Sequence, residues 1–96
     1  MKRSSLEMDV AVLQALSGPK LLKLTHIMYK ANLNAQTLKE KLVALETKGL
    51  IKSQKLHKNH IKNSGKDRMF YGATSKGLEV LRNYLSVYNA LGSVEQ

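Results

Sequence analysis

The sequence contains no cysteine and no tryptophan, and only one proline and one phenylalanine among its 96 residues. Without cysteine, the chain forms no disulfide, holds no metal through thiolates and has no cysteine nucleophile. Its apolar runs are a few residues long, far short of the roughly 20 that a membrane-spanning helix needs. The basic residues 1–3 are followed by Glu7 and Asp9 instead of the apolar core of a signal peptide. We therefore expect a soluble intracellular protein with no membrane partner.

Patterns typical of catalysis are also missing. There is no glycine-rich phosphate loop, no carboxylate pair at a useful spacing and no serine in a nucleophile elbow. His26, His57 and His60, with no cysteine and no clear carboxylate partner, are a weak signal for a metal site. We expect no catalytic residue, no metal, no cofactor and no small-molecule substrate, so the chain is predicted not to be an enzyme.

Acidic residues are few, and the positive charge that remains is concentrated. The chain has 16 Lys and Arg against 7 Asp and Glu, for a net charge of +9, which attracts polyanions. Residues 19–49 carry six positive and two negative charges, and residues 50–73 carry six and one. The segments before and after them are each neutral overall. Positive charge that served only solubility would be expected along the whole chain and not only in its middle. The middle of the chain is therefore predicted to contact phosphates.

Local signals predict the first helix. Ser4 and Glu7 have the spacing of a capping box, and Gly18 and Pro19 break the helical pattern, so this helix is expected from about Ser4 to Ser17. Apolar residues recur along it at helical spacing: Leu6, Val10, Leu13 and Leu16.

Two further helices and a tight turn follow. Residues 20–24 have the pattern of a short strand, and Thr25 is a good N-cap for a short helix that ends near Ala31. Asparagine tolerates unusual backbone angles, so residues 32–34 are predicted to form a turn. Asn34 also caps the next helix, which extends to about Lys48. Its inner face is predicted to consist of Leu38, Leu42 and Leu45.

The second half of the chain is predicted to form a hairpin and a helix. Residues 50–58 and 69–73 have strand character around a turn at residues 63–66. Thr74 or Ser75 caps a last helix that runs to about Leu91. Two short helices joined by a tight turn and followed by a basic hairpin form the winged helix-turn-helix order.

The predicted fold is therefore α+β, with a three-helix core, a β-hairpin wing and a C-terminal dimerisation helix. We expect one domain over residues 1–96. Residues 4–73 hold the helix-turn-helix and the wing, and residues 74–92 form the C-terminal helix.

The helix from Asn34 to Lys48 is the candidate recognition helix, because its N-terminal end would enter the major groove of double-stranded DNA. Glutamine pairs with adenine, lysine reaches guanine or phosphate, and threonine touches the thymine methyl group. Glutamate accepts from cytosine N4, or pairs with a neighbouring lysine. The alternative is a solvated polar helix face. The candidate base-reading residues are Asn34, Gln36, Thr37, Lys39, Glu40 and Lys41.

The hairpin is expected to act as a wing that holds phosphates without reading sequence, the alternative being a soluble loop. Its candidate residues are Lys55, Lys58, His60, Lys62, Lys66 and Arg68. Further contacts with the DNA backbone are expected from Thr25, Tyr29 and Lys30.

The last helix has more apolar surface than one small core needs. We expect one side to pack on the domain and the other on a second copy, to give a homodimer; the alternative is that all of it packs internally. The expected dimer residues follow a short heptad pattern: Leu78, Leu81, Leu85 and Tyr88. A second apolar flank consists of Val80, Tyr84, Val87 and Leu91.

The run Thr25–Leu33 resembles a signature of small archaeal winged-helix DNA-binding proteins, among them chromatin-associated dimers and predicted transcriptional regulators. Residues 42–51 and 71–81 match patterns shared by many winged-helix families, and the resemblance covers about residues 5–90. It implies that residues 34–48 form the recognition helix and that the last helix dimerises. Because the last helix spans only about 17 residues, roughly 25 Å, a compact dimer is expected.

The favoured hypothesis is a dimeric regulator that binds double-stranded DNA in the cytoplasm, associated with the nucleoid. The alternatives are an architectural chromatin protein that ignores sequence, and a protein–protein interaction module, which would need no basic face. RNA binding is disfavoured because Phe70 and four tyrosines offer little platform for stacking bases.

Overall fold

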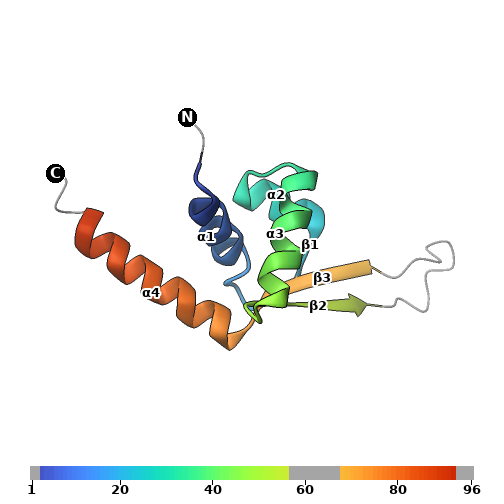
Figure 1. Ribbon diagram of the computed structural model, residues 1–96. Helices are drawn as coiled ribbons and strands as arrows, with labels where there is room; N and C mark the ends of the chain where they lie inside the picture. Colours follow the sequence, from blue (N-terminus) through green and yellow to red (C-terminus); the bar gives the residue numbers. More distant parts are fainter. Residues whose placement is uncertain (1–2, 57–67, 93–96) are drawn as a thin grey trace, which may run out of the picture.

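The computed structural model describes residues 3–56 and 68–92, which form helices and strands in the predicted order (Figure 1). The elements are α1 (Ser5–Ala15), β1 (Leu22–Lys23), α2 (Leu24–Ala31), α3 (Ala35–Thr47), β2 (Ile51–Leu56), β3 (Arg68–Ala73) and α4 (Ser75–Gly92). The strands β2 and β3 and the helix α4 extend in opposite directions from the cluster of α1, α2 and α3 (Figure 1).

Short-range hydrogen bonds fix the helix starts that the sequence predicts. The capping box of α1 is present: the Glu7 backbone N–H donates to Ser4 Oγ at 3.0 Å, and the Ser4 N–H donates to Glu7 Oε1 at 2.8 Å. Asn34 Oδ1 caps α3 by accepting from the Thr37 N–H at 2.8 Å. Asn32 adopts a left-handed conformation, with φ of 57°, and ends α2 as the predicted turn requires.

The prediction that Thr25 caps α2 is wrong. The helix begins at Leu24, its N-cap is Lys23, and no side chain caps it. Lys23 is already held in an extended conformation by β1, which pairs with β3, so the chain turns into the helix directly from the strand. The sheet therefore sets this boundary, and Thr25 lies within the first turn of α2.

The three strands form one antiparallel sheet in the order β1-β3-β2. The pair β2–β3 runs in register from Ile51 opposite Ala73 to Leu56 opposite Arg68. On its other side β3 pairs with β1, with Leu22 opposite Tyr71. The predicted turn at residues 63–66 lies outside the described residues.

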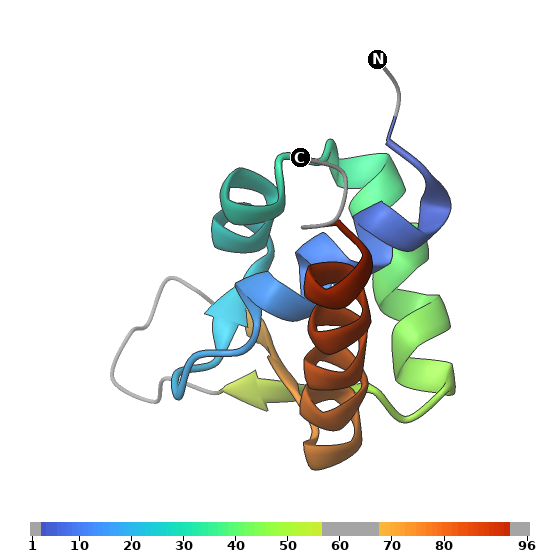
Figure 2. The ribbon, with the colours of Figure 1, turned by 90° about the vertical axis from the view of Figure 1, so that its left-hand side faces the viewer.

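Helix α1 contacts α2, α3 and α4 and so lies at the centre of the helical cluster (Figure 2). Val10, Val12, Leu13 and Leu16 are buried and form a wide apolar face, in keeping with a helix that packs against three neighbours. Leu6, although it fits the apolar spacing, is exposed near the start of α1. The buried apolar core consists of Val10, Val12, Leu13, Leu16, Ile27, Ala31, Leu38, Leu42, Leu45, Ile51 and Leu81.

The start of α4 is fastened to the turn between α3 and β2. Thr74 Oγ1 donates to the Gly49 carbonyl at 2.7 Å and accepts from the Gly77 N–H at 3.0 Å. Gly77 is buried so closely against Leu50 that a Cβ atom at this position would collide with the Leu50 carbonyl oxygen.

Within the described part of the chain, no helix is long and apolar enough to cross a membrane.

Candidate nucleic-acid interface

Helix α3 presents a stripe of exposed side chains directly opposite its buried face. Leu38, Leu42 and Leu45 are buried, as predicted. At spacings of four, three and four, the side chains on the opposite face line up along the helix axis. This outward stripe consists of Gln36, Glu40, Val43 and Thr47. The side chains that would enter a groove are thus carried on a helix whose other face is anchored in the core.

Hydrogen bonds within the outward stripe hold three of its side chains. Gln36 Nε2 donates to Glu40 Oε2 at 3.2 Å, one helical turn away. The Thr47 hydroxyl donates to the Val43 carbonyl at 2.8 Å. Glu40 therefore pairs with an amide and does not form the lysine pair considered from the sequence. Gln36 keeps its carbonyl oxygen as an acceptor beside the Glu40 carboxylate.

The structure assigns Lys41 a different place from the predicted one. Its ammonium group forms an ion pair with Asp9 Oδ1 at 3.1 Å and donates to the hydroxyl of Ser5 at 2.6 Å and to the backbone carbonyl of Ser5 at 3.3 Å. Only 15% of the side chain is exposed. The position of Lys41 turns it towards α1, so this lysine fastens α3 to α1 and does not reach outwards with the stripe.

The other predicted residues of α3 have distinct surroundings. Lys39 is exposed at the edge of the outward stripe. Thr37 is half-buried, and its N–H is held by the cap. Asn34 is exposed, with its carbonyl oxygen used for capping, so its amide N–H groups are what it can offer to DNA.

The basic arm, which is the predicted wing and includes β2 and β3, lies next to α3. Ser53 of β2 donates a hydrogen bond to Glu46 of α3 at 2.8 Å, which joins the two elements. Lys55 and Arg68 are exposed on neighbouring strands, and Lys52 adds an exposed cation that was not among the predicted residues. The other predicted wing residues lie outside the described part of the chain: Lys58, His60, Lys62 and Lys66.

A hollow of about 310 Å³ separates α3 from β3. Val43 and Lys39 lie at its rim on α3, and Tyr71 of β3 lines the other side. Val43, which is 67% exposed, is the member of the outward stripe that lines this hollow.

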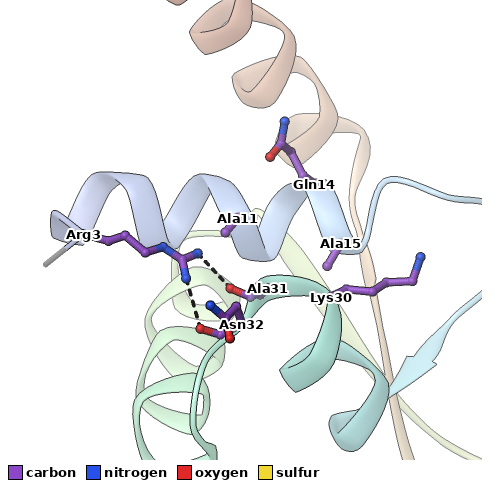
Figure 3. A pocket seen from close by; sticks show the side chains of 7 residues that line it. All are labelled: Arg3, Ala11, Gln14, Ala15, Lys30, Ala31 and Asn32. Carbon is purple, nitrogen blue, oxygen red and sulfur yellow. Dashed lines mark hydrogen bonds between the residues drawn. The ribbon is translucent and has the colours of Figure 1, made fainter. Parts of the chain in front are cut away.

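The residues predicted to meet the DNA backbone from α2 do not form one group. Thr25 and Tyr29 lie one turn apart and line a common hollow, and Tyr29 is 86% exposed. Lys30 instead lines a hollow between α1 and α2 (Figure 3).

The hollow between α1 and α2 has a volume of about 640 Å³. The small residues Ala11 and Ala15 line it beside Gln14 (Figure 3). Arg3 donates to the carbonyl oxygens of Ala31 at 2.7 Å and Asn32 at 3.0 Å, and so satisfies the C-terminal end of α2 (Figure 3).

Helix α4 exposes a different apolar face from the predicted one. Leu81 lies in the core of its own chain with 6% exposed, and Leu85 packs against that core, so these two residues are not placed for a partner. Leu78 is half-buried and Tyr88 is exposed, stacked on Tyr84 with ring centroids 6.0 Å apart. The exposed apolar residues of α4 are Val80, Val87, Tyr88 and Leu91.

The fold and the outward helix identify the family. A model of the winged helix-turn-helix family matches residues 2–91. The chain belongs to this family. No curated protein matches the chain.

Solved structures agree with this winged-helix fold. A PadR family transcription regulator from Clostridium difficile is 23% identical, with a TM-score of 0.77 over 91% of this chain and 92% of that one. Sso10a-2, a DNA-binding protein from Sulfolobus solfataricus, is 20% identical, with a TM-score of 0.67 over 97% and 90%. MepR from S. aureus, solved in complex with DNA, is 20% identical, with a TM-score of 0.67 over 93% and 68%. At these identities the likeness concerns the fold.

Sequence reasoning missed Val43 and Thr47 on the outward stripe, and Lys52 on the arm. The signal for the first two was available, because both lie at helical spacing from Glu40 on the side opposite the leucines. Among the described residues no cluster of three or more histidine or acidic side chains is placed to hold a metal ion. His57 and His60 lie outside those residues.

Proposed function

We propose that this winged-helix chain is a homodimeric transcription regulator that binds double-stranded DNA. Helix α3 lies in the major groove, and the basic arm holds phosphates. The observation that carries this proposal is the outward stripe of α3, which is exposed opposite a buried leucine face. Lys39 lies at its edge, and Val43 and Tyr71 line a hollow beside it. The DNA complex of MepR, which shares the fold, supports it.

The composition of the outward stripe favours a protein that reads sequence over an architectural one. A helix that only neutralises phosphates gains nothing from a carboxylate or an exposed valine at its centre, yet Glu40 and Val43 lie there. A carboxylate in the groove is repelled by the phosphates, and a hydrogen bond accepted from a base amino group offsets that cost. We therefore propose that α3 selects among base pairs.

The exposed face of α4 supports the homodimer. Val80, Val87 and Leu91 lie on one flank at spacings of seven and four, and 57% of Val87 and 67% of Leu91 are exposed. Burying such a face against a second copy removes apolar surface from water, and a two-fold dimer matches palindromic half-sites. The proposed dimer surface therefore lies on this flank and includes Tyr88.

Selection from a random duplex pool at two salt concentrations, with sequencing of the bound fraction, tests the proposed function. A palindrome whose half-sites lie about one helical turn apart is expected. Binding without enrichment would indicate an architectural protein that ignores sequence. A failure to bind at low salt would exclude DNA binding and favour a protein–protein interaction module.

The wing is tested with the triple substitution Lys58→Ala/Lys62→Ala/Lys66→Ala. We expect weaker binding to every duplex and a smaller dependence on salt, because these lysines would neutralise phosphates. Unchanged affinity at low salt would show that the arm does not contact DNA.

A further inference from the structure

Val43 lies at the centre of the outward stripe and is not part of the buried core. It is 67% exposed, and its neighbours along the stripe are Glu40 and Thr47. Single exposed apolar residues are common on protein surfaces. A β-branched residue on an exposed helix surface, however, favours neither helix formation nor solubility. Val43 is therefore available for a contact outside the chain.

The chemistry around Val43 limits what that contact is. The Thr47 hydroxyl donates its one proton inwards, to the Val43 carbonyl, so it offers no donor outwards. On the other side of Val43, Glu40 and the Gln36 carbonyl present hydrogen-bond acceptors. The middle of the outward stripe thus combines acceptors with an apolar group.

An A·T pair matches this combination in the major groove. Adenine presents its N6 amino group as a donor, and thymine presents its C5-methyl group, whereas a G·C pair has an amino donor but no methyl group. We propose that Val43 determines specificity by packing against a thymine methyl group in each half-site. This inference rests on the proposed function, because it requires α3 to lie in the major groove.

Deoxyuridine lacks only the methyl group of thymine, so it isolates the proposed contact. Duplexes carrying the selected site are prepared with each thymine replaced in turn by deoxyuridine, symmetrically in both half-sites. Their affinities are measured for the unaltered protein, for Val43→Ala and for Leu6→Ala. Leu6 is also an exposed apolar residue, 58% exposed on α1, and serves as the matched control.

At one thymine position, the unaltered protein and Leu6→Ala are expected to lose affinity about fourfold for each methyl group removed, the value of burying one such group. Val43→Ala is expected to bind the thymine and deoxyuridine duplexes equally. Val43→Ala should fold normally, since the side chain is exposed; circular dichroism checks this.

Two results would overturn the inference while leaving DNA binding intact. In one, the unaltered protein is insensitive to deoxyuridine at every position. In the other, Val43→Ala discriminates as strongly as the unaltered protein. If no duplex is bound at all, the proposed function fails as well.

Discussion

Lys39 and Lys41 lie two positions apart on α3 and have opposite surroundings. Lys39 is exposed at the edge of the outward stripe, whereas the ammonium group of Lys41 is held by Asp9 and Ser5 of α1. A lysine that neutralises a phosphate releases a counterion, and a lysine already paired within the protein does not. We therefore expect Lys39 to contribute to DNA binding and Lys41 to contribute to stability.

We expect Lys39→Ala to weaken DNA binding and to lower the slope of log affinity against log salt by about 1 per protomer. Lys41→Ala should leave the slope nearly unchanged and lower the free energy of unfolding by about 1 kcal/mol. Fluorescence anisotropy across a salt series and denaturant unfolding measure the two effects. Equal slopes for both variants would contradict the assignment.

Gly77 is the residue at which the packing of α4 is least tolerant. A Cβ atom there would collide with the Leu50 carbonyl oxygen, which backbone atoms cannot easily relieve. We expect Gly77→Ala to lower the free energy of unfolding by about 1–3 kcal/mol, as overpacking of a close contact does. Gly18→Ala is the matched control, because nothing lies within 4 Å of a Cβ at that position. Thermal unfolding that shows equal losses for both variants would argue against this contact.

At the scale of the elements, the cap of α3 links folding to binding. The Asn34 side-chain oxygen fixes the first turn of the helix, directly before the outward stripe begins. The amide N–H groups of the same side chain are the part that would contact DNA. The two halves of this side chain are separable by substitution.

Asn34→Ala is expected to cost about 1 kcal/mol of stability through the lost cap, and Asn34→Ser to restore most of it. If the amide group also contacts DNA, Asn34→Ser should bind DNA more weakly than the unaltered protein despite its restored stability. Urea unfolding and anisotropy titrations on the three proteins give the comparison. Full affinity for Asn34→Ser would leave Asn34 with a capping role alone.

Most element boundaries were predictable because their signals are local. The Ser4–Glu7 capping box, the Asn32 turn and the Asn34 cap each act within four residues along the chain, and all three are confirmed. The start of α2 was not, because its boundary depends on the pairing of β1 with β3, far away in the sequence. The local preference of Thr25 for a capping position carries no information about that strand pairing.

At the scale of the whole molecule, the proposed dimer depends on α4. Its buried side holds Leu81 in the core, and its exposed flank carries Val87 and Leu91. The neutral charge of this segment, compared with the basic middle of the chain, suits a surface that meets a copy of itself.

We expect Val87→Glu/Leu91→Glu to shift the protein from dimer to monomer without unfolding it, because both side chains are exposed and the introduced charges would be buried in the dimer. Sedimentation equilibrium measures the shift, and DNA affinity should fall because each half-site is then bound separately. Leu6→Glu, which changes an exposed apolar residue on α1, serves as the control. A dimer that survives the double substitution would place the interface elsewhere.

The order of the elements, the leucine face of α3 and the concentration of charge in the middle of the chain were predictable from the amino-acid sequence. These features depend on helical periodicity, on caps that act within a few residues and on composition. The partners of several side chains were not predictable in this way, because they depend on tertiary packing. That packing turned Lys41 towards Asp9 of α1, placed Leu81 in the core and left Val43 exposed. Such contacts depend on how helices far apart in the chain pack together, and the local pattern of residues does not encode that arrangement.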